Sequence, residues 1–301
     1  MLANRSCRVI PIVRSRSPAA RFSSQTNDYR HGHSTPIQRK TALVAGVANA
    51  RSIAWACARS LLRTHDVIVT VQNDRVKASV DKLIAEREDR VDGDGGGGRI
   101  LGSLVCDVTD EPAVETMFTE RIPELLHREE ILEANLDALV HSLAFASSTA
   151  MKGNDGTEAA GFPLLHTSRD DFRTAHEISS YSLLLLSRCA LPLLSNTDNN
   201  NNNATPSSSS ITALSYLGAT RAIPNYNIMG PAKASLEALV RGLALELSPP
   251  PPLGRSIRVN AVSAGPIVTA AARGGIRGFG DMRREYEGRN ALRRNVAVEE
   301  V

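Results

Sequence analysis

The sequence has few cysteines and no long apolar segment. Its four cysteines, spread over 301 residues, form no Cys-x-x-Cys pair. This spacing argues against a disulfide scaffold and against a metal site, and it fits a reducing compartment. Arg188 and Pro192 interrupt the most apolar run, residues 182–194. No run reaches the roughly 18 apolar residues that span a bilayer, so we expect no membrane insertion.

The excess of positive charge is confined to the N-terminus. Residues 1–40 hold eight of the 35 basic residues and one of the 32 acidic residues. The remaining chain therefore carries 27 basic and 31 acidic residues, a net charge of −4, although the whole chain has +3. Because a mildly acidic body offers no electrostatic footprint for DNA or RNA, we expect no nucleic acid as a partner.

Four segments differ in composition from the rest of the chain. Residues 1–38 are rich in Arg and Ser and hold one acid, which is typical of organellar transit peptides. We expect a mitochondrial location, with a plastid or cytoplasmic one as alternatives, since a disordered basic tail has a similar composition. Segments near 92–98, 196–210 and 249–254 are rich in Gly, Asn/Ser and Pro, which predicts surface insertions in one domain that spans residues 39–301.

Predicted strands and helices alternate along this domain. The strands are expected at residues 41–45, 66–71, 100–106, 136–142, 210–215 and 257–262. The helices are expected at residues 52–62, 77–87, 112–126, 170–194 and 226–247. Such alternation predicts an α/β fold with a doubly wound, Rossmann-like parallel sheet. Ligands should then bind at the carboxyl ends of the strands.

Three polar motifs follow the first three predicted strands. Residues 46–54 (GVANARSIA) open a helix, where a pyrophosphate could bind. They lack the G-x-G-x-x-G spacing, so an ordinary turn with Ser52 as helix cap is an equal alternative. Residues 72–74 (Gln-Asn-Asp) lie where Rossmann domains contact a ribose, or form a polar turn. Asp107 could accept a hydrogen bond from adenine, or cap the next helix.

The strongest motif lies at residues 215–233. Tyr226 and Lys233 are seven positions apart in a predicted helix, so they should share one face. A nearby ammonium lowers the pKa of a phenol from about 10 toward working pH, which makes a proton donor for a developing oxyanion. Tyr216 ends the preceding strand and could point into the same pocket. The alternative is two interfacial tyrosines and a solvated lysine.

This run closely resembles the NADH-dependent enoyl-acyl-carrier-protein reductases, a divergent group of short-chain dehydrogenases/reductases. That group uses Tyr-x6-Lys with an additional upstream Tyr. Ordinary members of the superfamily use Tyr-x3-Lys and a Ser before the Tyr, and the corresponding positions here are Gly230 and Ala213. Motifs at residues 46–54, 72–74, 106–108, 141–146, 175–182 and 259–267 also agree, so that the resemblance covers about residues 40–301.

The resemblance implies roles for individual residues. Tyr226 would hydrogen-bond a thioester carbonyl oxygen, Tyr216 would assist or orient the acyl chain, and Lys233 would bind the nicotinamide ribose. Ala146 would contact the substrate. The residues implied for NADH are Gly46, Ser52, Ile53, Gln72, Asp107, Val108, Leu143, Lys233, Ile267, Thr269 and Ala271.

The implied reaction is NADH-dependent reduction of the trans-2 double bond of an enoyl thioester on acyl carrier protein, in fatty acid synthesis. A carbonyl or 3-oxoacyl reductase of the same superfamily is one alternative, against which Ala213 argues. A catalytically inactive NAD-binding protein is another.

Two departures concern the C-terminal part. Gly274, Gly275, Gly278 and Gly280 predict a loose substrate lid. The sequence ends at Val301, where the family continues into another helix and a final strand. Such a truncation would expose an edge of the sheet, so we expect the chain to be either an incomplete product or less stable than its relatives. It would also remove an interface of the homotetramer that resembling proteins form.

Overall fold

The computed structural model describes residues 39–88, 97–131, 134–153, 161, 163–194, 209–248 and 257–301. Residues 1–38 and almost all of the three predicted insertions lie outside the described residues. Residues Arg39–Val301 form one compact unit. No helix in its described parts has the length and apolar character needed to cross a membrane.

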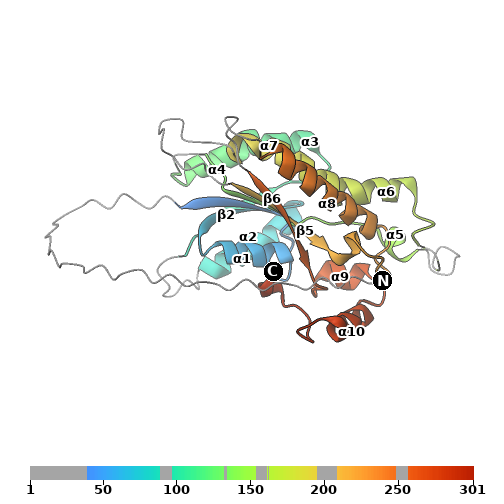
Figure 1. The fold of residues 1–301 in the computed structure, drawn as a ribbon. Coiled ribbons are helices and arrows are strands. Elements are labelled where there is room, and N and C mark those ends of the chain that lie inside the picture. The colour runs from blue at the N-terminus through green and yellow to red at the C-terminus, as the bar shows by residue number, and fades with distance from the viewer. Residues whose placement is uncertain are drawn as a thin grey trace, which may run out of the picture. The chain divides into compact units, whose positions relative to one another are not determined.

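A six-stranded sheet forms the centre of this unit (Figure 1), with the order β3-β2-β1-β4-β5-β6 and every neighbouring pair parallel. The strands are β1 (Lys40–Ala45), β2 (His65–Val71), β3 (Ile100–Val105), β4 (Ala138–His141), β5 (Ser210–Tyr216) and β6 (Arg258–Ala264). The doubly wound α/β fold predicted from the alternation of elements is confirmed. In this order β6 forms one edge of the described sheet.

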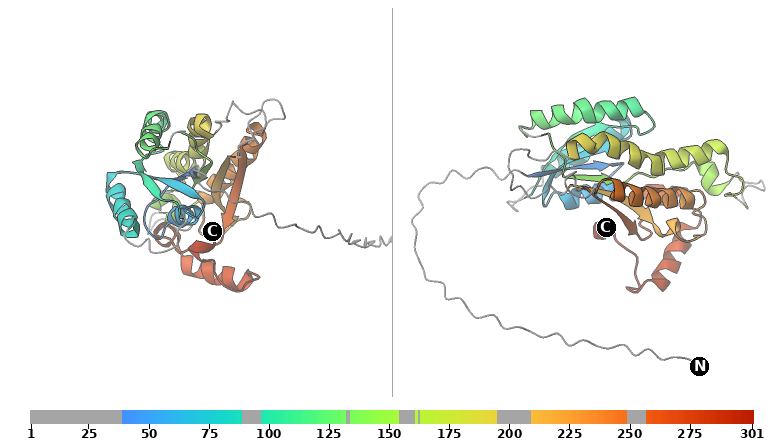
Figure 2. Two further views of the ribbon diagram at one scale, coloured as in Figure 1. Left: turned by 90° about the vertical axis from the view of Figure 1, so that its left-hand side faces the viewer. Right: turned by 45° about the horizontal axis from the view of Figure 1, so that its top comes forward.

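Helices cover both faces of the sheet (Figure 2). They are α1 (Ile53–Leu61), α2 (Asp74–Glu88), α3 (Glu111–Thr116), α4 (Ile122–Arg128), α5 (Ser148–Lys152), α6 (Arg169–His176), α7 (Ser182–Leu194), α8 (Met229–Glu246), α9 (Ala270–Gly275) and α10 (Phe279–Arg289). Helices α3, α4, α7 and α8 pack on one face, and α1 and α2 pack on the other. Beyond α10 a short turn, η5 (Val298–Glu300), lies against α1.

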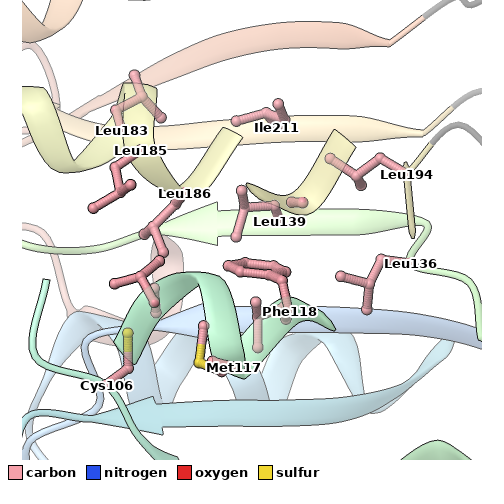
Figure 3. Close-up of a cluster of buried hydrophobic side chains, with 14 of the residues drawn as sticks. Cys106, Met117, Phe118, Leu136, Leu139, Leu183, Leu185, Leu186, Leu194 and Ile211 are labelled. Atoms are coloured by element: carbon pink, nitrogen blue, oxygen red, sulfur yellow. The ribbon is translucent and has the colours of Figure 1, made fainter. Parts of the chain in front are cut away.

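Alternating strand residues fill the two cores. Leu43 of β1 faces the α7 side, in register with Ile68 of β2 and Leu139 of β4. The next residue, Val44, faces the α1 side beside Val69. Figure 3 shows the α7-side core, in which leucines of α7 meet Leu139 and aromatic and thioether side chains from the α3–α4 region. Strands with two buried faces explain the nearly continuous apolar runs in the sequence.

Two of the predicted helices are interrupted by a π-helical turn. Residues 112–126 contain η1 (Met117–Arg121) between α3 and α4. Residues 170–194 contain η3 (Glu177–Tyr181) between α6 and α7. Single π turns in helices often occur at functional sites, and η3 lies behind the segment that follows β4, where Ser179 contacts Phe145.

Candidate active site

Tyr226 lies in a turn ahead of α8. The residues on either side of it, Asn225 and Asn227, have positive φ angles of 62° and 41°, a conformation that Asn tolerates better than most residues. Helix α8 therefore begins only at Met229. The prediction that Tyr226 and Lys233 share a face of one helix is wrong, because the left-handed Asn227, between Tyr226 and Met229, stops the helix from extending back to Tyr226.

The structure nevertheless brings the two tyrosines together. The ring of Tyr226 packs edge-to-face on that of Tyr216, with centroids 4.8 Å apart and planes at 61°. Ala146 and Met151 belong to the same apolar cluster. Position 218 must be glycine here, because a Cβ would overlap the Tyr226 ring. Both tyrosines and the predicted substrate residue Ala146 thus lie in one cluster at the carboxyl end of β5.

Burial sets the protonation of Tyr226, which is only 8% exposed. Desolvation raises its pKa above the ordinary value, and Tyr216 adds to this effect. The prediction that Lys233 lowers this pKa is wrong, since the loss of water around the phenol dominates. At neutral pH Tyr226 is therefore a protonated phenol, which can donate a hydrogen bond to a developing oxyanion in a water-poor site.

Tyr216 is in a less enclosed position. Burial raises the pKa of Tyr216 as well, with smaller contributions from Tyr286 and Glu285. Its hydroxyl group lies 3.5 Å from the sulfur of Met282 in α10. Ile276, between α9 and α10, packs on the same apolar cluster. The glycine-rich segment predicted as a loose lid thus contains α9 and the start of α10, and α10 contacts Tyr216 through Met282.

Lys233 is buried at the end of the sheet, with 4% of its surface exposed. The alternative of a solvated lysine is therefore wrong. Its Nζ donates to the carbonyl oxygens of Leu214, at 2.7 Å, and Leu143, at 3.3 Å. An ammonium has three N–H donors, so the third can serve a ligand. Burial lowers the pKa of Lys233 to about 8, whereas Glu237 acts to raise it.

The turn after β1 has the properties of a phosphate-binding turn. Gly46 has a φ of +97°, and a Cβ there would lie 2.5 Å from the Ser142 carbonyl oxygen, so only glycine fits. Ser52 caps α1: its Oγ accepts a hydrogen bond from Trp55 N, at 3.3 Å, and donates to Asn49 O, at 2.7 Å. The first turn of α1 holds no acidic residue, so the positive end of the helix dipole is available to an anion.

The residues predicted for adenosine lie at two polar turns. Gln72 is exposed at the end of β2. Asp107 accepts hydrogen bonds from Thr109 N, at 3.0 Å, and Thr109 Oγ1, at 2.8 Å. The alternative that Asp107 caps the next helix is wrong, because Asp110 is the N-cap of α3. Val108, between them, is buried.

The residues predicted for nicotinamide are unequally placed. Leu143 shares its carbonyl oxygen with Lys233, at 3.3 Å. Ile267 is buried, whereas Ala271 in α9 is exposed. Thr269 caps α9 by accepting a hydrogen bond from Ala272 N, at 3.1 Å. Ile53, the first residue of α1, is half-buried.

Comparisons with known proteins agree with this geometry. A family model described as enoyl-(acyl carrier protein) reductase matches residues 46–301. The NADH-dependent enoyl-[acyl-carrier-protein] reductase of Enterococcus faecalis is 37% identical over 88% of this chain and 88% of its own length. That of Escherichia coli is 38% identical over 88% and 85%. The chain belongs to the enoyl-acyl-carrier-protein reductase family.

Solved structures of the family share the fold. The enoyl reductase of Bacillus cereus with NADP⁺ and indole naphthyridinone has a TM-score of 0.67 and 36% identity, over 87% of this chain and 86% of that one. The enoyl reductase of Anaplasma phagocytophilum in complex with NAD has a TM-score of 0.67 and 31% identity, over 87% and 84%.

Three buried polar residues of this enoyl reductase were not assigned roles from the sequence. Ser179 Oγ accepts from Phe145 N, at 3.0 Å, and lies 3.1 Å from Phe145 O, so it pins the segment before Ala146. His141 Nε2 lies 2.7 Å from Ser182 Oγ. In the sequence, a polar residue within an otherwise apolar segment is the pattern that could have indicated these positions.

Among the described residues, no group of three or more His, Cys, Asp or Glu could hold a metal.

Proposed function

We propose that this chain reduces the trans-2 double bond of an enoyl thioester carried by acyl carrier protein, with NADH as reductant, in fatty acid synthesis. Its family membership supports the reaction class. The observation that carries the proposal is the buried phenol of Tyr226, which packs on Tyr216 in the cluster that includes Ala146. Ala213, on β5, provides no hydroxyl group, so the superfamily's usual Ser is absent, which disfavours a carbonyl or 3-oxoacyl reductase.

The residues of the site fit a nicotinamide dinucleotide. The acid-free N-terminus of α1, with Gly46, Ser52 and Ile53, suits a pyrophosphate. The neutral amide of Gln72 suits ribose hydroxyl groups, and Asp107 and Val108 suit adenine. The remaining N–H of Lys233 suits the second ribose. Leu143, Ile267, Thr269 and Ala271 would flank the nicotinamide.

When bound, NADH supplies a hydride to the β-carbon of the substrate. Negative charge then develops on the thioester oxygen as an enolate forms. Tyr226 donates its O–H to that oxygen, and burial strengthens this hydrogen bond because no water competes. A proton from solvent then adds to the α-carbon of the enolate, which balances the hydride at the β-carbon and completes the reduction. Ser179 fixes the segment that carries Ala146, and Tyr216 orients the acyl chain against Tyr226.

The test is an assay of NADH oxidation by the full chain, with a trans-2-enoyl thioester on acyl carrier protein as substrate. The loss of NADH absorbance measures the rate. We expect turnover with this substrate and little with a 3-oxoacyl thioester. A folded chain that reduces only the 3-oxoacyl substrate, or that binds NADH and reduces neither, contradicts the proposal. The same assay with a coenzyme A thioester tests the preference for the carrier protein.

We also propose that residues 1–38 direct the chain to mitochondria, on the basis of their Arg-rich, acid-poor composition. Fusion of these residues to a fluorescent reporter tests whether they direct a protein to mitochondria. Reporter fluorescence in plastids or in the cytoplasm would contradict it.

A further inference from the structure

Two neighbouring residues of β5 are bonded to two residues one helical turn apart on α8. The carbonyl oxygen of Leu214 accepts from Lys233 Nζ at 2.7 Å. The hydroxyl group of Ser215 donates to Glu237 Oε1 at 2.6 Å. Since residues four apart on a helix are neighbours on its surface, the Glu237 carboxylate is held on the same side of α8 as Lys233.

The negative charge of Glu237 affects Lys233 because the buried ammonium group of Lys233 is shielded from solvent. Burial lowers the pKa of Lys233 to about 8, and the Glu237 carboxylate opposes that change. His141 on β4 also interacts electrostatically with Lys233, and Tyr226 precedes α8, the helix that carries Lys233. Burial lowers the pKa of His141 to about 3 and raises that of Tyr226, so both are neutral near pH 7.

We propose that Glu237, held by Ser215, is a positioning residue that keeps Lys233 charged and aligned for its contact with the nicotinamide ribose. Ser215 supplies the second half of this arrangement, because its O–H fixes which way the carboxylate points. This inference rests on the proposed NADH site. It assigns to Ser215 and Glu237 a function beyond the structural contact between β5 and α8.

The pH dependence of NADH affinity tests the assignment. The dissociation constant is measured by the fluorescence of bound NADH from about pH 6 to about pH 10, a range that spans the pKa of a lysine. We expect wild-type affinity to fall with a midpoint near the pKa of Lys233, about 8. Glu237→Gln keeps an acceptor for Ser215 but removes the charge, and should lower the midpoint by about one pH unit.

Two further variants complete the test. Ser215→Ala leaves the Glu237 carboxylate free to turn toward solvent, and should lower the midpoint in the same direction by less. Glu246→Gln removes the same charge from an exposed position on α8 and should leave the midpoint unchanged. Circular dichroism establishes that each variant is folded.

The outcomes separate this inference from the proposed function. An unchanged midpoint in folded Glu237→Gln overturns the inference even if its melting temperature falls, because a purely structural contact would lower stability alone. If Glu237→Gln does not fold, an unchanged midpoint in Ser215→Ala overturns it. A folded wild-type chain that does not bind NADH contradicts the proposed function, and this inference with it.

Discussion

Tyr226 and Lys233, on the substrate side of the proposed site, are 8% and 4% exposed, whereas Gln72 on the adenosine side is exposed at a turn. The buried pair shapes its surroundings through close contacts. A glycine leaves room for the Tyr226 ring, and two backbone carbonyl oxygens accept from Lys233. Burying such polar groups costs free energy. Their position in the core therefore indicates a functional requirement, because the fold could form without that cost.

Residues near the adenosine side have local structural tasks. Ser52 caps α1, and Asp107 closes a turn with Thr109. Asn73, beside Gln72, accepts a hydrogen bond from Val76 N at the start of α2. A polar residue at an exposed turn therefore gives weak support for a binding role, and a buried polar residue in the apolar core gives strong support. Substitutions on the two sides should differ accordingly.

The largest effect is expected for Tyr226→Phe. The variant loses only the hydroxyl group that we propose donates to the enolate, so kcat should fall by about 10³-fold with little change in melting temperature. Steady-state rates with an enoyl thioester and NADH measure the change. Wild-type turnover in this variant would exclude Tyr226 as the donor.

Gly46→Ala should disrupt the turn after β1, which lies between the adenosine side and the substrate side of the proposed site. Alanine at φ +97° is strained, and its Cβ would meet the Ser142 carbonyl oxygen and the Leu143 side chain. The combined strain and overpacking should lower the free energy of unfolding by about 3 kcal/mol. NADH affinity should fall as well, because a displaced Leu143 would disturb the hydrogen bond from Lys233 Nζ to the Leu143 carbonyl oxygen. Urea unfolding measures the first effect, and Gly242→Ala, on α8 with open space around it, is the matched control.

The sequence predicts the fold well, because each strand is a short apolar segment between two helical ones. The predicted strand at residues 66–71, for example, lies within observed β2, His65–Val71. It does not predict where α8 begins, since asparagines such as Asn225 and Asn227 adopt positive φ less regularly than glycine. It also does not predict the raised pKa of Tyr226, because that pKa depends on tertiary burial.

His141 extends the comparison to the buried core. Burial lowers its folded-state pKa to about 3, from 6.5, so the unfolded chain binds one more proton between these pH values. The unfolding free energy should therefore fall as pH drops below about 6.5, by about 2 kcal/mol near pH 5. His141→Gln should lose this contribution. Urea midpoints near pH 7 and pH 5 measure it, with exposed His127→Gln as control. Equal pH dependence in His141→Gln and the wild type would contradict the prediction.

Gln72→Ala should have the smallest effect, and its neighbour provides the contrast. Gln72 is exposed, so its loss should leave stability within about 0.5 kcal/mol and weaken NADH binding by roughly threefold, as expected for one exposed hydrogen bond of well under 1.5 kcal/mol. Asn73→Ala removes the acceptor for Val76 N and should cost about 1 kcal/mol of stability without changing NADH affinity. Calorimetric melting and NADH titration of both variants separate binding from folding. If Asn73→Ala weakens NADH binding more than Gln72→Ala does, the ribose contact belongs to Asn73, and the motif at residues 72–74 binds through the residue that also starts α2.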